Sequence, residues 1–323
     1  MRRAALALGV FVGLASAALR VEGAPSLWQR AKNPGEARLL VALERRLDEM
    51  ALAAREPDTA ERIARAGVAL IELARVDNPA DPRLAFMMAR VLLAADVNRE
   101  VYAERLLEHA VAELPVSPLL AKAWLELGLL RALRGDPAAA VDAESRALEL
   151  ALDPDQRAVA FCRRAAAEAE LQALTRAESD YRTAAEAARD PALQALARFG
   201  LGLVLERQGD LPSAYAVFQQ GLTIALPISA YATDELLELP GAFFSPSYDR
   251  FYVGALLAMT RARVERDPRA RRIELEQAVA DWDAYLLAAR ADEVWVPNAK
   301  RHRERCVREL SRLPRARRKS TNP

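Results

Sequence analysis

A small side chain that recurs at a constant interval constrains the fold of this chain more than any other feature. Five alanines recur at a spacing of 37 residues. The residue seven positions after each of them is also apolar or small: Leu73, Ala110, Ala147, Ala184 or Gly221. Offsets of zero and seven fall on one face of an α-helix, so each unit is predicted to contain a helix that a neighbour can approach closely. A fixed period of this length is typical of a repeat architecture. The alanines, spaced 37 residues apart, are Ala66, Ala103, Ala140, Ala177 and Ala214.

In each unit, another helix is predicted to precede the helix that carries the recurring alanine. The preceding helix is called the first helix of the unit, and the helix with the alanine is called the second. Small residues stand twelve positions before three of the alanines, at Gly128, Ala165 and Gly202, within apolar stretches of helical spacing. Between the two helices lie the segments 134–137 and 208–212, where glycine can end one helix and aspartate with proline can begin the next. The predicted unit is therefore helix, tight turn, helix.

The repeated unit resembles the tetratricopeptide repeat, in a chain of an exported bacterial type. The residues that carry the resemblance are Trp124 to Gly128, Gly135, Asp136, Ala140 and Ala147, and again Leu201, Gly202, Gly209, Asp210, Ala214, Phe218 and Gly221. The match is specific over 120–225, although the turn glycine is missing within 158–190. The segment 82–115 matches mainly in its second helix, and 36–75 matches poorly. The resemblance implies an all-α fold, an α-solenoid of stacked antiparallel helix pairs.

The interval of 37 residues is three longer than the usual tetratricopeptide period of about 34. The spacing from Gly128 to Ala140 equals that from Gly202 to Ala214, so the additional residues must follow the second helix. We therefore expect longer second helices or longer linkers after them.

The chain divides into six predicted segments. Only 13 glycines occur among 323 residues and no stretch alternates apolar and polar residues for long, which favours helices throughout. The predicted segments are a signal peptide (1–17), a linker (18–35), a solenoid of about five helix pairs (36–225), an insertion rich in proline and aromatic residues (226–247), a sixth helix pair with a capping helix (248–313), and a basic disordered tail (314–323).

The first residues read as an export signal. A basic start at Arg2 and Arg3 precedes an uncharged apolar stretch over 4–19, and Ala15 to Ala17 offers the small residues that a signal peptidase cleaves after. Cleavage after Ala17 would release a periplasmic or secreted protein. The alternative is an uncleaved inner-membrane anchor through 4–19, with the remainder facing the periplasm.

The sequence gives little indication of catalysis. The two histidines, His109 and His302, have no neighbours in a recognised catalytic arrangement, and no phosphate-binding glycine loop or metal-binding motif occurs. We therefore expect no enzyme activity, no metal and no cofactor. Lysine plus arginine, 46, nearly balance aspartate plus glutamate, 45, so we expect no nucleic-acid partner. Cys162 and Cys306 are expected to be buried, unpaired thiols.

A concave groove is the first candidate site, because the resemblance implies that the first helix of each pair lines such a surface. An apolar groove suits an amphipathic helix or an apolar extended segment of a partner protein. The alternative is that the same residues are simply packed in the interior. The matching positions are Lys122, Leu125 and Leu129, then Val159, Cys162 and Ala166, then Leu196, Phe199 and Leu203.

Two further candidates lie towards the C-terminus. Five aromatic residues fall within ten positions and could form a binding hot spot or could pin the insertion onto the solenoid. The segment from Ala299 to Lys319 contains ten basic residues and only two acidic ones. The basic tail could therefore contact an anionic lipid or polymer. The alternative is a solvated tail without a partner. The five aromatic residues are Phe243, Phe244, Tyr248, Phe251 and Tyr252.

These observations favour a non-enzymatic scaffold of the cell envelope that binds a protein or peptide segment in its groove. The alternative is a structural subunit of an envelope assembly that self-associates through its terminal helices or its aromatic insertion. A molecular mass that rises with concentration in light scattering would favour the alternative, and a strictly monomeric protein would count against it.

Overall fold

The computed structural model describes residues 80–95, 100–150, 152–225, 237 and 244–314. The predicted signal peptide, linker and first helix pair lie outside the described residues, as do Phe243 and all of the tail after Pro314. The described part contains eleven helices and no strand. None of these helices combines the length and the apolar character that a membrane-spanning helix requires.

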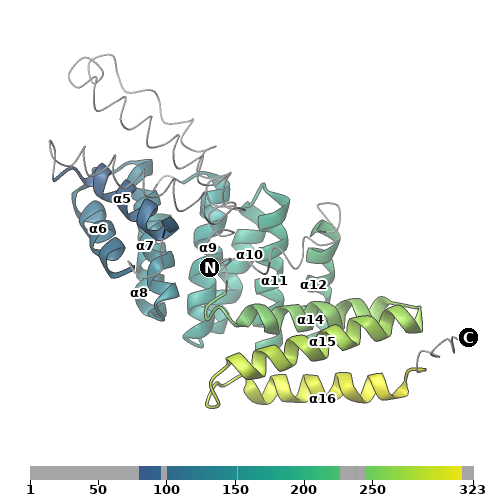
Figure 1. Ribbon diagram of the computed structural model, residues 1–323. Helices are drawn as coiled ribbons and strands as arrows, with labels where there is room; N and C mark the ends of the chain where they lie inside the picture. The colour runs from purple at the N-terminus through teal and green to yellow at the C-terminus, as the bar shows by residue number, and fades with distance from the viewer. Residues whose placement is uncertain (1–79, 96–99, 151, 226–236, 238–243, 315–323) are drawn as a thin grey trace, which may run out of the picture.

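Eight of the helices form four consecutive pairs, and each helix packs against its neighbours along the chain. This arrangement, in which α9 to α12 stand side by side in Figure 1, confirms the predicted all-α solenoid of stacked, tetratricopeptide-like helix pairs. The pairs are α5 (Pro82–Ala95) with α6 (Glu100–Glu113), α7 (Pro118–Leu133) with α8 (Pro137–Leu148), α9 (Pro154–Glu170) with α10 (Leu174–Ala187), and α11 (Pro191–Arg207) with α12 (Leu211–Ala225).

The recurring alanines form one buried seam along the second helices. Ala103, Ala140, Ala177 and Ala214 lie on α6, α8, α10 and α12, and all four are buried. The small residues of the first helices face this seam. A Cβ atom on Gly202 would lie 2.7 Å from the Phe218 ring. Close approach of the paired helices therefore depends on the absence of side-chain volume at these positions, as the repeat predicts.

The turn within each pair closes in the same way in three pairs. The amide groups of Asp136, Ala173 and Asp210 each donate to the carbonyl five residues earlier, at 2.8 to 3.0 Å. This Schellman hydrogen bond requires a left-handed residue before it. Gly135 and Gly209 supply φ values of +77° and +90°, whereas Gln172 takes +61° in the pair that lacks the glycine. The pair that lacks the turn glycine therefore has the same turn, with Gln172 in the left-handed position.

The second helices are shorter than the first helices, and the expectation of longer second helices or linkers than in the usual repeat stays a prediction. The second helices α8, α10 and α12 have 12, 14 and 15 residues, whereas the first helices α7, α9 and α11 have 16, 17 and 17. Ser117, Asp153 and Asp190 cap these first helices with their side chains, and a proline follows each cap. This combination favours the start of a helix, so each of these first helices begins directly after its cap.

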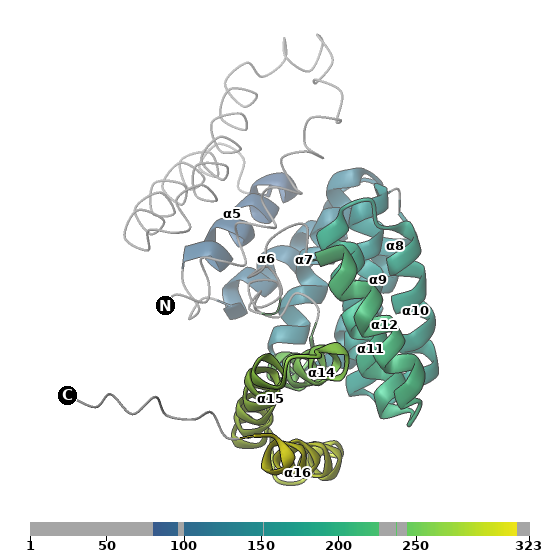
Figure 2. The same ribbon diagram turned by 90° about the vertical axis from the view of Figure 1, so that its right-hand side faces the viewer.

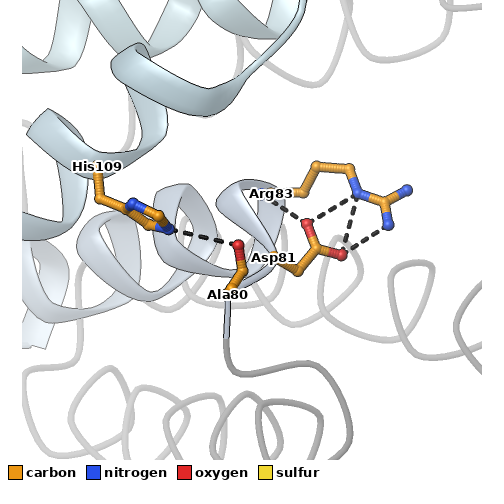
Figure 3. Close-up of polar contacts among 4 residues, drawn as sticks. All are labelled: Ala80, Asp81, Arg83 and His109. Atoms are coloured by element: carbon orange, nitrogen blue, oxygen red, sulfur yellow. Dashed lines mark hydrogen bonds and ion pairs between the residues drawn. The ribbon is translucent and has the colours of Figure 1, made fainter.

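The beginning of α5 shows the same local chemistry (Figure 3). The Asp81 carboxylate accepts a hydrogen bond from the Arg83 amide at 2.9 Å and three more from the Arg83 guanidinium. His109 of α6 approaches the carbonyl oxygen of Ala80 at 3.4 Å. The start of the described stack is therefore held by a side-chain cap and by the second helix of the same pair.

Three further helices form a C-terminal unit, α14 (Asp249–Val264), α15 (Pro268–Ala288) and α16 (Val296–Arg312). In Figure 1 these helices run across the lower part of α9 to α12 at a steep angle, and Figure 2 shows the unit to one side of α11 and α12. α14 packs against both α11 and α12. One continuous hydrophobic core extends from α9 into this unit.

Candidate functional site

The predicted groove residues lie on the first helices α7, α9 and α11, and almost all of them are buried. Leu129 of α7 is the exception, because its side chain is half-buried. Val159, Cys162, Leu196, Phe199 and Leu203 belong to the same core as the C-terminal unit. Lys122 and Leu125 are also buried, and Leu125 packs against Ala147 and Ala160. These positions do not present an open groove, and their contact with a partner stays a prediction.

Exposure along the first-helix face falls from α7 to α11. We define the α7 stripe as Lys122, Glu126, Leu129 and Leu133, which lie on one side of the helix at offsets of zero, four, seven and eleven. Leu133 is 48% exposed, and Glu126 and Leu129 are half-buried. The residues 37 and 74 positions later, on α9 and α11, are buried with the exception of the half-buried Glu170. The face is thus accessible mainly on α7.

The C-terminal unit packs against α11 and α12 and is held there by buried polar contacts, and the segment just before it bonds to the end of α9. Arg207 at the end of α11 donates to Asp249 of α14 at 2.7 Å, and both side chains are almost fully buried. The Arg207 guanidinium also stacks over the rings of Tyr252 and Trp295. Burial raises the pKa of Asp249 to about 6, although the nearby Arg207 opposes the shift. The pair is ionised at neutral pH.

A second buried connection joins α11 to all three C-terminal helices. Glu206 of α11 accepts a hydrogen bond from the Tyr252 hydroxyl at 2.7 Å and lies 2.8 Å from His302 Nε2 of α16. His302 stacks on Trp282, and Tyr252 meets Trp282 edge to face. A hydrogen bond from Ser245 to Glu170 connects the segment before α14 with the end of α9.

The aromatic candidates lie in this junction. Phe244 and Tyr252 are buried in the core, and Tyr248 and Phe251 pack against it while remaining half-buried. The Tyr248 hydroxyl donates to Glu293 at 3.2 Å. Phe243 lies outside the described residues. Burial of Phe244 and Tyr252 favours the structural alternative for these two residues, which is to pin the C-terminal segment onto the solenoid. A role in partner binding stays a prediction for the cluster.

The open end of the face carries charge as well as leucine. Glu126 lies 3.8 Å from Arg90 of α5, and both side chains are largely covered. On the opposite side of α7, Arg131 lies 3.8 Å from Glu104 of α6. The α7 stripe therefore combines a half-buried ion pair with two leucines of increasing exposure. Glu126 and Leu133 were not among the residues predicted from the sequence, although the helical spacing from Lys122 through Leu129 could have indicated both.

A buried acid lies behind this face, between α7 and α9. Glu144 of α8 packs against Gly128 and lies 3.8 Å from Arg163 of α9. Arg163 donates to the carbonyl oxygen of Leu125 at 2.9 Å. Burial raises the pKa of Glu144 to about 8, against the opposing attraction of Arg163. The protonated carboxyl is therefore the favoured form at neutral pH.

This shift predicts a loss of stability at alkaline pH. Because the pKa of Glu144 is higher in the folded state than in the unfolded state, its contribution is fully present below the unfolded value of about 4.5 and is lost as the pH rises through about 8. We expect Glu144→Gln, which cannot ionise, to lose less stability than the unmodified protein between pH values of about 6 and 9. Urea unfolding of both proteins at the two pH values measures the difference. Parallel losses would contradict the assignment.

The described residues offer little that resembles a reaction centre. Within the described ranges, no group of three or more histidine, cysteine, aspartate or glutamate residues is placed to hold a metal ion. Cys162 and Cys306 are free and buried, as predicted. Burial raises the pKa of both thiols, that of Cys306 to about 11, which disfavours the nucleophilic thiolate.

Comparison with known proteins adds modest similarities. No protein-family model matches the sequence, and no curated protein matches it. The chain is similar to the crystal structure of MamA protein, with 17% identity and a TM-score of 0.45 over 58% of this chain and 94% of that chain. It is also similar to the APC/C hetero-tetramer Cut9-Hcn1, with 15% identity and a TM-score of 0.42 over 84% of this chain and 56% of that chain. At these values, the fold assignment rests on the helix pairs described above.

Proposed function

We propose that the protein is a non-enzymatic scaffold that holds a segment of a partner protein against the α7 stripe. The observation that carries this proposal is the uneven exposure of the first-helix face. At α9 and α11 the face is buried, the C-terminal unit is bonded to the end of α11, and the segment before α14 is bonded to the end of α9. At α7 it offers Leu129 and Leu133 beside the ion pair of Arg90 and Glu126.

The chemistry of the α7 stripe suggests the kind of segment that binds there. Two leucines one turn apart suit apolar side chains of an amphipathic helix, or alternate side chains of an extended segment. The ion pair of Arg90 and Glu126 lies beside the two leucines. A polar group of the bound segment can therefore contact this ion pair, which would orient the segment. In this proposal, the partner binds only the part of the predicted groove that it can reach without displacing the C-terminal unit.

Replacement of the two leucines by glutamate tests the proposal. We expect Leu129→Glu together with Leu133→Glu to weaken binding of the partner from envelope extract by about 100-fold or more, because loss of two leucine contacts costs about 1.5 kcal/mol each. The partner is first identified by mass spectrometry on the unmodified protein. Its affinity for both proteins is then measured with purified components.

Val116→Glu provides the matched control, since Val116 is an exposed apolar residue in the connection before α7 and lies off the stripe. The control should bind the partner as the unmodified protein does, and circular dichroism should show unchanged helix content in both variants. Equal partner recovery by the stripe variant and the control would remove the α7 stripe as the docking site.

The site of action in this proposal is the cell envelope. Support comes from the sequence, where a basic start, the apolar stretch 4–19 and small residues up to Ala17 resemble an export signal. Cell fractionation tests the location, and a chain that stays in the cytosol with an intact N-terminus would contradict it. Self-association stays the alternative, and the exposed Leu287 and Val294 at one end of the C-terminal unit are its best candidates for a contact between copies.

A further inference from the structure

Positive charge gathers at one end of the C-terminal unit. The segment 261–273, which spans the turn from α14 to α15, contains six arginines and two carboxylates. Three of the arginines, Arg261, Arg271 and Arg272, pair with Glu274, Glu309 and Glu276 outside the segment, and among the described residues the other three do not. The whole chain has a formal net charge of only +1, so this concentration is local. A local excess of one sign, rather than the net charge of the chain, sets the field that a nearby charged surface experiences.

The two carboxylates in this turn are engaged with backbone amides. Asp267 caps α15 by accepting hydrogen bonds from the amides of Arg269 and Ala270. Glu265 accepts from the amide of Asp267 at 2.8 Å. Arg266 and Arg269 are exposed, and within the described part of the chain neither lies in an ion pair. Their charges are therefore available to a partner.

The end of α16 adds to the same surface. Arg271 of α15 pairs with Glu309 of α16 at 3.0 Å, and Arg272 donates to the carbonyl oxygen of Leu313 at 2.8 Å. These contacts bring the exposed Arg312 to the turn between α14 and α15. In Figure 1 this is the end of the unit at which α16 ends.

Apolar side chains are interleaved with these arginines. Val264 and Ile273 are 59% and 65% exposed, and they flank Arg266 and Arg269 in the sequence. We name this surface the basic tip and define it as Val264, Arg266, Arg269, Ile273 and Arg312. Exposed aliphatic residues among arginines gain nothing from a purely ionic polymer, but they gain burial at the boundary between lipid headgroups and acyl chains.

We infer that the basic tip binds the surface of an anionic lipid bilayer. The arginines contact lipid phosphates, and Val264 and Ile273 enter the headgroup region. This inference is independent of the partner-docking role of the α7 stripe, which lies on a different part of the molecule.

A fluorescent probe at position 264 tests the inference directly. Cys162 and Cys306 are buried, so a Val264→Cys variant of the full chain can be labelled selectively with an environment-sensitive dye such as NBD. We expect a blue shift of its emission with phosphatidylcholine vesicles that contain phosphatidylglycerol, and no shift with phosphatidylcholine alone. The same dye on Val116→Cys should not respond to either vesicle.

Two sets of substitutions in the labelled protein separate the possible outcomes. Arg266→Gln, Arg269→Gln and Arg312→Gln together should weaken vesicle binding by about 100-fold. Ile273→Ser should weaken it by roughly 10-fold. No blue shift at position 264, or equal shifts at 264 and 116, would overturn the inference. Binding that free heparin abolishes and that Ile273→Ser leaves unchanged would also overturn it, since the site would then recognise a polyanion and not a bilayer.

Discussion

Replacement of Asp249 by alanine is expected to lower the free energy of unfolding by about 3–5 kcal/mol, among the largest effects of any single substitution in this chain. The substitution leaves Arg207 charged and buried, without the carboxylate that it contacts at 2.7 Å. The same contact joins α11 to α14, so the loss should also loosen the C-terminal unit from the solenoid. Chemical unfolding above a pH of about 6, where Asp249 is ionised, measures the effect.

An exposed ion pair provides the control for this prediction. Arg182 and Glu178 lie one turn apart on α10 and pair at 2.8 Å, with 54% of the Arg182 side chain and 25% of the Glu178 side chain exposed. Arg182→Ala should cost no more than about 0.5 kcal/mol. Replacing both buried partners, with Arg207→Met and Asp249→Leu, should recover most of the lost stability, because no buried charge is then left without a counter-ion. Similar losses for Asp249→Ala and Arg182→Ala would contradict the role of the buried pair.

Gly200→Ala is expected to destabilise the protein by about 3 kcal/mol through overpacking. A Cβ atom at this position would lie 2.7 Å from Cδ1 of Tyr181, and closer still to two other atoms of the same ring. Tyr181 is fully buried between α10 and α11, so the ring has little room to move. Thermal and chemical unfolding of the variant measures the loss.

Gly135→Ala is the control for this prediction, because it changes the backbone preference of a glycine position without overpacking. No atom lies within 4 Å of a Cβ at Gly135, whose φ of +77° is left-handed, so alanine there should cost only about 1 kcal/mol. Combining Gly200→Ala with Tyr181→Leu should cost less than the sum of the two single changes, because the smaller side chain makes room for the methyl group. Strict additivity would show that the ring is not the obstacle.

Much of the fold follows from local sequence. The spacing of Ala103, Ala140, Ala177 and Ala214 correctly predicted one buried seam, because only small residues allow two helices to approach so closely. The glycines of two turns were also predicted. Gln172 was not, since the geometry that places it in a left-handed conformation is set by the packing of α9 against α10 rather than by its own preference.

Less of the candidate site than of the fold could be predicted from the sequence. Helical periodicity shows which residues share a face, but it does not show what lies on that face. Leu125, Phe199 and Leu203 were predicted alongside Leu129, and only Leu129 is partly exposed. Aliphatic residues on an open groove and on a buried interface have the same spacing, so the sequence does not distinguish them.

By itself, the sequence determined the helices, their caps, the tight turns and the stacking of successive pairs, because each depends on residues within one or two turns of helix or on the constant repeat interval. Only the tertiary structure decided where the first-helix face is open. The contacts over the ends of α9 and α11 join residues far apart in the chain, such as Arg207 with Asp249, 42 residues apart, and Glu206 with His302, 96 apart. Such contacts depend on how a whole helical unit docks, and no local spacing encodes that geometry.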